Sequence, residues 1–415
     1  MIEFLNIVLL TIAVGITIPM AMLALECLAA ICGRARAAAH DDADPAVAAH
    51  PSVAVLIPAH NESVIIADTI RTCRLQLAEQ DQLWVVADNC EDDTADVARN
   101  HGARVIERNN VEQRGKGYAL DFGLQAMAAA DAPQIVIILD ADCQVQPGAV
   151  GTLARMASET DRPVQAAYLI TSPANSASPQ SLVSHCAVTL KNLIRPLGMR
   201  RLGLGTLLTG SGMAFPWHQI AGARLATGHI VEDMQMSIDF LVAGQGPLFC
   251  PDAVVLSELP AGRTASTVQR TRWEHGHLQV MFSQTPRLLG AAIRQRRWKL
   301  AAAALDLAVP PLSLLAMSWL AGCAATVLAG VLAGLWLPAL VLAIGGLTTG
   351  LSVGTAWMLY ADPPVSWRAI AAVPWYVLGK IPLYLSFMSG RQRVWVRTPR
   401  GTAATALKAC DASVE

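Results

Sequence analysis

Carboxylates and cations gather in a few short motifs of this sequence, and their spacing suggests chemistry. Asp140 and Asp142 follow an apolar run and are separated by one residue. Two carboxylates placed in this way can share one hard divalent cation, Mg²⁺ or Mn²⁺, whose other positions take water and phosphate oxygens. Because most isolated acidic triplets are solvated loop residues, this triplet indicates a metal site only together with the motifs around it.

Two further motifs carry groups that suit phosphate binding and proton transfer. Segment 114–117 (RGKG) opens a helical pattern, and its backbone amides and cations could cradle phosphates. A plain helix start with solvated basic residues explains the same pattern. Glu232 and Asp233 open another periodic segment. Either carboxylate is a candidate general base, although acids in a first helical turn also simply favour the helix dipole.

Two more segments have the composition of substrate-binding or membrane-facing elements. Segment 209–212 (TGSG) reads as a turn whose flexible backbone can approach a substrate. Segment 269–273 (QRTRW) lies in a basic stretch, where the simpler explanation is a membrane-surface helix with an interfacial tryptophan.

The elements that must position these motifs follow from the apolar pattern. Strand-like runs at 53–57, 83–87 and 135–139 alternate with helical stretches near 62–78, 92–101 and 115–130. This alternation favours a parallel sheet with crossover helices, and such sheets bind ligands at the carboxyl ends of their strands. We therefore expect one site at the ends of the first, second and fourth strands, built from segments 58–62 (PAHNE), 88–93 (DNCEDD) and 140–142 (DAD).

Composition narrows the class of protein. Of the 415 residues, 53% are hydrophobic and only 15% are charged, whereas soluble domains carry about 25% charge. A purely soluble enzyme is therefore not expected. The formal net charge of −1 gives no electrostatic case for nucleic acid. The nine cysteines are scattered and never in CxxC spacing, which predicts reduced thiols rather than a zinc site or a disulfide framework.

Long apolar runs lie at both ends of the chain. The run 4–32 is long enough to cross a bilayer, which needs roughly 20 helical residues. Its first basic followers are Arg34 and Arg36, so the positive-inside rule predicts an outside N-terminus and a cytoplasmic chain from residue 34 onward. The second block, 301–360, predicts two spans at about 303–330 and 334–360, with Pro310-Pro311 kinking the first.

The segment 369–388 is apolar but carries Lys380 and two prolines. If it crossed the membrane, the basic tail after residue 390 would lie outside, against the positive-inside rule. We therefore favour an interfacial or re-entrant helix there over a third C-terminal span. The arginine cluster within 263–300 belongs on the cytoplasmic side by the same rule.

These patterns predict six regions. They are an N-terminal transmembrane helix (1–33), a linker (34–50), a cytoplasmic α/β domain (51–260), a basic membrane-interface region with the QxxRW motif (261–300), two transmembrane helices plus an interfacial or third spanning helix (301–390), and a basic C-terminal tail (391–415).

The order of the motifs resembles that of one known family. The motifs follow one another in the order PAHNE, DNCEDD, RGKG, DAD, TGSG, ED and QxxRW. This order resembles that of the membrane-bound family 2 glycosyltransferases, the clan of cellulose and hyaluronan synthases and bacterial exopolysaccharide transferases. The resemblance covers about 53–300. It implies an α/β nucleotide-sugar-binding (GT-A-like) domain with a mainly parallel sheet, flanked by transmembrane helices, and an inverting, UDP-sugar-dependent hexosyltransferase.

The resemblance also implies roles for the matching residues. Asp88 would accept a hydrogen bond from the uracil edge of the donor, and the other donor-site residues would be Pro58, His60, Glu62, Lys116 and Asp140. Asp142, with Asp140, would bind Mg²⁺ or Mn²⁺ on the diphosphate. Asp233 would be the general base and Arg272 would hold the departing diphosphate. The acceptor path would be lined by Gly210, Ser211, Gln269 and Trp273.

Three functions remain open at this point. The first is addition of one sugar from a UDP-sugar to a lipid-linked oligosaccharide or glycan acceptor at the cytoplasmic face of the inner membrane, for exopolysaccharide synthesis. The second is a processive β-polysaccharide synthase that extrudes its product, with or without an export partner. Three or four spans are few for a polymer channel, so we favour single addition. The third is a non-catalytic membrane scaffold, which the intact acidic motifs argue against.

Overall fold

The chain forms two compact units that interleave along the sequence. The computed structural model describes residues 1–33, 51–171, 179–223, 225–226, 232–258, 263–362 and 367–389. We call Ala46–Pro173, Leu207–Gly276 and Gln392–Glu415 the sheet unit, and Met1–Pro45, Ala174–Thr206 and His277–Arg391 the helical unit. The predicted linker 34–50, with Arg34 and Arg36, and the predicted basic tail 391–415 lie outside the described residues.

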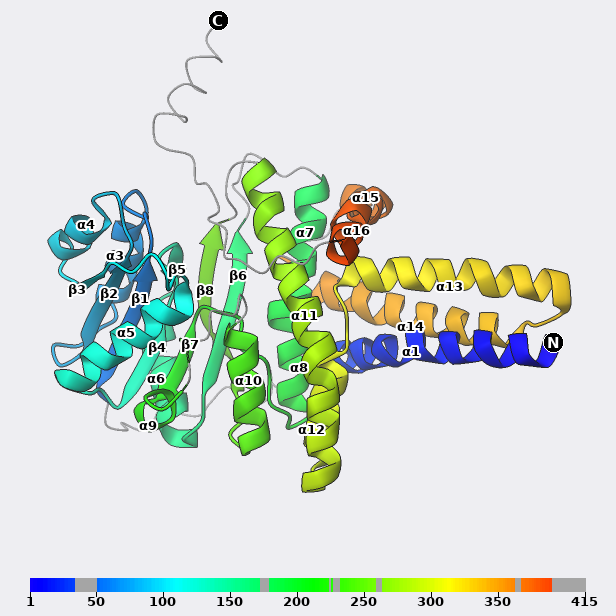
Figure 1. The fold of residues 1–415 in the computed structure, drawn as a ribbon, viewed down its shortest axis with the longest axis horizontal. Coiled ribbons are helices and arrows are strands. Elements are labelled where there is room, and N and C mark those ends of the chain that lie inside the picture. Colours follow the sequence, from blue (N-terminus) through cyan, green and yellow to red (C-terminus); the bar gives the residue numbers. More distant parts are fainter. Residues whose placement is uncertain are drawn as a thin grey trace, which may run out of the picture. The chain divides into compact units, whose positions relative to one another are not determined.

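The sheet unit contains a mixed eight-stranded sheet of order β3-β2-β1-β4-β7-β6-β8-β5 (Figure 1). Strands β1 to β4 are mutually parallel, and the first antiparallel pairing is between β4 and β7. The strands are β1 Val53–Ala59, β2 Gln82–Asp88, β3 Arg104–Arg108, β4 Ile135–Ile138, β5 Cys143–Val145, β6 Val164–Thr171, β7 Met213–Pro216 and β8 Leu248–Glu258. The predicted parallel arrangement of the first strands is therefore confirmed.

Helices cover both faces of this sheet. Along β1, Val53, Val55 and Ile57 belong to one buried cluster and Ala54 and Leu56 to another, so both faces are packed. This explains the continuous apolar run, which is typical of buried parallel strands. Helices α3 and α6 contribute to the first cluster, and α5 and α10 to the second. The helices of this unit are α3 Ile66–Arg74, α4 Thr94–Asn100, α5 Lys116–Ala129, α6 Ala149–Thr160, α9 Trp217–Ile220 and α10 Glu232–Ala243, and α11 Arg263–Gln295 continues into the helical unit.

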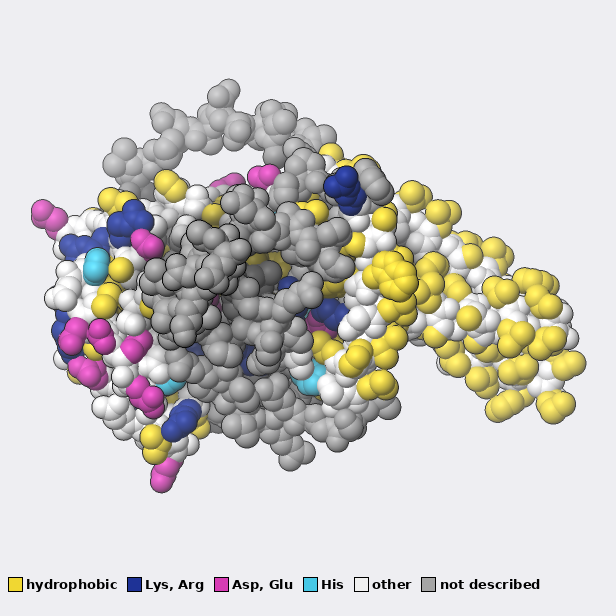
Figure 2. All heavy atoms as spheres, turned by 90° about the horizontal axis from the view of Figure 1, so that it is seen from above, with side chains coloured by type: hydrophobic (Ala, Val, Ile, Leu, Met, Phe, Trp, Pro, Cys, Tyr) yellow, Lys and Arg dark blue, Asp and Glu magenta, His cyan; other side chains and the backbone are white. Residues whose placement is uncertain are grey.

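The helical unit is built around three long apolar helices. Helices α1, α13 and α14 pack against one another (Figure 1), and hydrophobic side chains dominate the outer surface of this bundle (Figure 2). Each is long and apolar enough to cross a membrane, as is the window Ile370–Phe387. The helices are α1 Ile2–Cys32, α7 Pro179–Thr189, a π-helix η1 Leu190–Ile194, α8 Arg195–Arg201, α12 Trp298–Leu307, α13 Leu312–Ala333, α14 Leu337–Tyr360, α15 Trp367–Leu378 and α16 Ile381–Ser389.

The two prolines at 310 and 311 separate two helices, which corrects the prediction of one kinked span at 303–330. Helix α12 ends at Leu307 and α13 begins at Leu312. Two consecutive prolines remove two backbone N–H donors and hold the preceding residues extended, so the chain starts a new helix instead of bending one. The apolar segment near the C-terminus is likewise two short helices, α15 and α16, rather than one.

A buried ion cluster joins three segments of the helical unit. Arg195, the first residue of α8, donates from Nε to Glu26 Oε2 at 2.6 Å and from Nη2 to Asp306 Oδ1 at 2.5 Å. Glu26 lies on α1 and is fully buried, and Asp306 lies on α12. Since an unpaired charge is costly in such surroundings, this arginine fixes the mutual arrangement of these helices.

Candidate active site

Hydrogen bonds join the segment after β1 to the end of β2 and to the start of α4. His60 Nδ1 lies 2.7 Å from the Asp88 carbonyl oxygen. Because a carbonyl only accepts, His60 carries its proton on Nδ1. The Glu62 backbone N–H donates to Thr94 Oγ1 at 2.8 Å, and Pro58 lies within β1. The predicted donor-site residues of the first two motifs therefore lie at one edge of the sheet.

Asp88, the last residue of β2, is held by two donors on the same oxygen. Arg108 Nη1 donates to Asp88 Oδ1 at 2.7 Å, and Asn89 Nδ2 donates to it at 2.9 Å. Arg108 is the last residue of β3 and pairs with Asp88 in the strand register. Both side chains of this ion pair are 9% exposed. The sequence pattern did not reveal this arginine.

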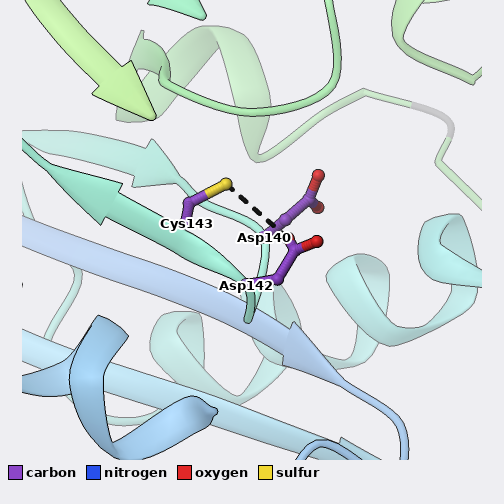
Figure 3. Close-up of side chains that lie close together, drawn as sticks. All are labelled: Asp140, Asp142 and Cys143. Atoms are coloured by element: carbon purple, nitrogen blue, oxygen red, sulfur yellow. Dashed lines mark hydrogen bonds between the residues drawn. The ribbon is translucent and has the colours of Figure 1, made fainter. Parts of the chain in front are cut away.

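Asp140, Asp142 and Cys143 form a group that could hold a metal ion (Figure 3). One ligand atom from each lies within 4.8 Å of the others. Cys143 Sγ lies 3.7 Å from Asp142 Oδ1, and Ser257 Oγ donates to Asp142 Oδ2 at 3.3 Å. Burial raises the pKa of the Cys143 thiol well above its usual value, and the carboxylates of Asp142 and Asp140 add to this. The thiol is therefore protonated at neutral pH. Cys143 directly follows the acidic triplet, and this adjacency was the available sequence signal.

Lys116 connects the acidic triplet to the TGSG segment. Its ammonium group donates to the Asp140 carboxylate and, at 2.6 Å, to the Gly210 carbonyl oxygen. Although burial alone would lower the pKa of Lys116, the carboxylates of Asp140, Glu232 and Asp233 raise it above its usual value. The lysine therefore stays charged. Lys116 is the first residue of α5, as the RGKG motif predicted.

Glycines allow the close approaches around this lysine. A Cβ on Gly117 would collide with the Leu225 carbonyl oxygen. Gly210 has φ +93°, and a Cβ there would lie 3.3 Å from Asp233 Oδ2 and 3.7 Å from Lys116 Nζ. Asp233 and Lys116 therefore border the same glycine, which places the candidate base beside the candidate phosphate-binding lysine.

Glu232 and Asp233 open α10, as predicted. Burial, with a further contribution from Asp233, raises the pKa of Glu232 to about 7. Asp233 Oδ1 accepts the Met234 backbone N–H at 2.8 Å. Ser237 donates to the Asp233 carbonyl oxygen at 2.7 Å and accepts the Leu208 N–H at the same distance. The start of α10 is thereby tied to the chain just before the TGSG segment.

Ser211 is fully buried and holds the backbone of Asp140 in place through a hydrogen bond. Its hydroxyl accepts the Asp140 backbone N–H at 3.0 Å and lies 3.1 Å from Cys143 Sγ. Gln165 holds the same segment, donating to the Ser211 carbonyl oxygen and accepting the Thr209 N–H, both at 2.9 Å. The predicted acceptor role of Ser211 stays a prediction. Sequence reasoning missed Gln165, whose strand carries no motif.

Gln269, Arg272 and Trp273 lie on α11 and are half-buried. Their spacing of three and four residues places them on one side of the helix. Gln269 Oε1 is buried and has no hydrogen-bond partner among the described residues.

Part of the chain is similar to known proteins. Residues 54–216 match the family described as "Glycosyl transferase family 2". The chain is 24% identical over 259 residues to a probable glycosyltransferase, YdaM, of Bacillus subtilis (strain 168). That alignment covers 56% of each protein, so the chain spans about half the length of this curated relative.

A solved structure resembles the fold over most of this chain. A mannosyltransferase from Pyrobaculum calidifontis, in complex with GDP-Man and Mn²⁺, superposes with a TM-score of 0.54 at 20% identity, over 92% of this chain and 99% of that one. Glucosyl-3-phosphoglycerate synthase from Mycobacterium tuberculosis, with Mn²⁺, UDP and phosphoglyceric acid, matches 56% of this chain and 78% of its own at 20% identity, with a TM-score of 0.36. The sheet unit thus has a GT-A-like fold, and residues 54–216 within it match the glycosyl transferase family 2 model, in a chain that also carries helices long and apolar enough to cross a membrane.

Proposed function

We propose that this protein transfers a sugar, with inversion, from a UDP-sugar to a lipid-linked oligosaccharide or glycan acceptor. The reaction takes place at the cytoplasmic face of the inner membrane and contributes to exopolysaccharide synthesis. The observation that carries the proposal is the position of Lys116, which bonds to Asp140 and Gly210 while Asp233 borders the same glycine. The candidate metal ligand, the candidate phosphate-binding cation and the candidate base thus lie around one glycine.

The donor occupies the strand ends of the sheet unit. Asp88 faces the base of the nucleotide, with Pro58, His60 and Glu62 lining the same pocket. Lys116 lies near the diphosphate, where its permanent charge attracts the phosphates. Two hydrogen bonds support this assignment, because they bring the segment after β1 against the end of β2 and the start of α4.

The ligand atoms of the acidic triplet, Asp140 to Asp142, suit a hard divalent cation. Asp142 and Asp140 would hold Mg²⁺ or Mn²⁺, since carboxylate oxygens suit both ions, and the two similar structures named above contain Mn²⁺. When bound, the ion would neutralise charge that develops on the departing diphosphate. Arg272 would add a second positive charge to the same leaving group.

Asp233 removes the proton from the acceptor hydroxyl, whose pKa is too high for unaided attack. The acceptor oxygen bonds to the anomeric carbon as the bond to the diphosphate breaks, and UDP leaves. Attack opposite the leaving group turns an α-linked donor into a β-linked product. The acceptor path would be lined by Gln269, Trp273, Gly210 and Ser211.

The second half of α11 supports a position at the membrane surface. Phe282, Leu289 and Ile293 are 63%, 40% and 81% exposed and recur at spacings of seven and four residues, which forms one apolar stripe. Arg287 and Arg294 lie on the adjoining exposed side. An apolar stripe beside cations is typical of a helix lying in an anionic lipid interface.

The short helices α15 and α16 support an interfacial position for the predicted segment 369–388. They have 12 and 9 residues, whereas a bilayer crossing needs roughly 20 helical residues. The combined window is apolar enough to span, but its two halves are separate helices. Helix α15 packs against α7 and also contacts α13.

A cysteine-labelling experiment tests the proposed orientation. Cysteines placed at position 45 or 285, in a chain without its nine native cysteines, should be shielded from impermeant thiol reagents in intact cells. A cysteine at position 2 should react. Permeabilised cells provide the control, because all three positions should then be labelled. Labelling at 45 or 285 from outside would reverse the orientation.

Product length distinguishes the proposed single addition from processive synthesis. Purified protein should extend a lipid-linked acceptor by one sugar when given the right UDP-sugar, and mass spectrometry of the product would show one added hexose mass. A ladder of longer products would favour the processive alternative. Absence of transfer across a panel of donors and acceptors, despite UDP binding, would favour the non-catalytic scaffold.

A further inference from the structure

The hydrogen bonds on Asp88 limit what this carboxylate can offer to a nucleobase. A carboxylate oxygen accepts about two hydrogen bonds. Asp88 Oδ1 already accepts two, from Arg108 Nη1 at 2.7 Å and from Asn89 Nδ2 at 2.9 Å. Among the described residues, no hydrogen bond occupies Oδ2. Asp88 therefore presents one accepting oxygen rather than two.

Both donors are fixed in place by the surrounding residues. Asn89 Oδ1 accepts the Asn110 backbone N–H at 2.8 Å, so the amide must point its Nδ2 toward Asp88. Asn89 itself has φ +52°, a left-handed turn that aims its side chain back at the strand end. The Arg108 guanidinium lies over the Tyr118 ring at 5.6 Å from its centroid. Moving either donor away from Asp88 would break these contacts.

We infer that Arg108 and Asn89 make the base pocket selective for uracil over guanine by occupying one oxygen of Asp88. Guanine presents N1–H and the exocyclic N2–H₂ side by side, and both oxygens of a carboxylate are needed to accept them. Uracil presents the single N3–H, flanked by the acceptors O2 and O4. One accepting oxygen beside a cationic donor matches uracil and leaves a guanine donor buried and unpaired, which is penalised.

This inference rests on the proposed function, in which Asp88 faces the base. It names Arg108 and Asn89 as positioning residues that act through Asp88. It also bears on the donor class, because the similar mannosyltransferase structure contains GDP-Man. The chain would use uridine nucleotides although its fold resembles that of a protein solved with a guanosine nucleotide.

Nucleotide affinities of the full-length protein in nanodiscs test the inference. We expect wild-type protein with Mg²⁺ to bind UDP at least about tenfold more tightly than GDP, the size of one unpaired hydrogen bond. In Arg108→Gln, the ratio of GDP to UDP dissociation constants should fall by about tenfold. Asn89→Gly keeps the ion pair and tolerates the left-handed backbone, so it should fold even if Arg108→Gln does not, and its ratio should also fall.

The matched control is Arg99→Gln, which removes an arginine of an exposed ion pair in the same unit and should leave the ratio unchanged. A loss of affinity for both nucleotides without a change in ratio would mean that Arg108 is only structural, and would overturn the inference. Wild-type preference for GDP would overturn it as well. If Asp88→Asn bound UDP as wild type does, the proposed donor pocket itself would be wrong, so the two failures are distinguishable.

Discussion

Replacing Asp233 by asparagine should lower the initial rate of sugar transfer by about 10²–10⁴-fold while UDP affinity stays near wild type. Asparagine keeps the size and hydrogen-bonding reach of the side chain but cannot take the acceptor proton. The groups assigned to the donor, namely Asp88, Asp142 and Arg272, are untouched. Initial rates and UDP binding measured on the same preparation would check both halves of the expectation.

Glu232 is the matched control for this substitution, because the two carboxylates are neighbours at the start of α10. Their side chains point about 100° apart, so they do not share one orientation toward the donor. Glu232→Gln should retain most of the turnover. If Glu232→Gln instead lost turnover and Asp233→Asn retained it, the base would be Glu232 and the motif register wrong by one residue.

The raised pKa of Glu232 adds a pH-dependent readout. Because its pKa in the folded protein is about 7, and that of an unfolded glutamate is about 4.3, the folded state binds the extra proton between these values. Its contribution to stability is therefore largest at acidic pH and is lost as pH rises through about 7. Glu232→Gln should raise the melting temperature relative to wild type at pH 8 and have less effect at pH 5.5.

Removal of the divalent metal should abolish transfer, and Mg²⁺ or Mn²⁺ should restore it. The acidic triplet supplies too few ligands to hold Mg²⁺ alone, so metal binding should depend on UDP. Asp142→Ala should weaken UDP affinity and turnover together, in contrast to Asp233→Asn. Full activity in EDTA would contradict the assignment of Asp140 and Asp142 as metal ligands.

Ser257→Ala and Cys143→Ala are the controls for this second prediction. Both side chains contact the Asp142 carboxylate, but neither is needed for a site made of oxygen ligands. Each variant should therefore keep metal-dependent turnover within about tenfold of wild type. A loss in Cys143→Ala as deep as that in Asp142→Ala would mean that the thiol takes part in metal binding, and the choice of hard cations would need revision.

Sequence patterns predicted the strand ends well because buried parallel strands have unbroken apolar sequences. Such runs end at Asp88 and just before Asp140, and both residues lie at the expected edge. Strand β3, with the sequence RVIER, is short and mixed in polarity, so its end at Arg108 carried no comparable signal. Arg108, which occupies one oxygen of Asp88, could therefore be identified only from the strand register.

Burial was the second property that local pattern did not reveal. The TGSG segment reads as an exposed turn, yet Ser211 is fully buried because Gln165 and Cys143 enclose it from β6 and β5. Strand β6 lies in a stretch without motifs, and although Cys143 directly follows the acidic triplet, that adjacency does not place it against Ser211. The prediction made from the prolines at 310 and 311 was wrong for a different reason. A kink and a helix break share one local signal and differ only in how the following residues pack.

The ion cluster of Arg195 has a consequence for how the chain is made. Glu26 is synthesised 169 residues before Arg195, and Asp306 follows 111 residues after it. At about 5–20 residues per second, the acid on α1 waits on the order of ten seconds or more for its arginine. We expect a chaperone, the insertion machinery or bound water to shelter Glu26 during that interval, so that assembly of this protein depends on the order of translation as well as on the final packing.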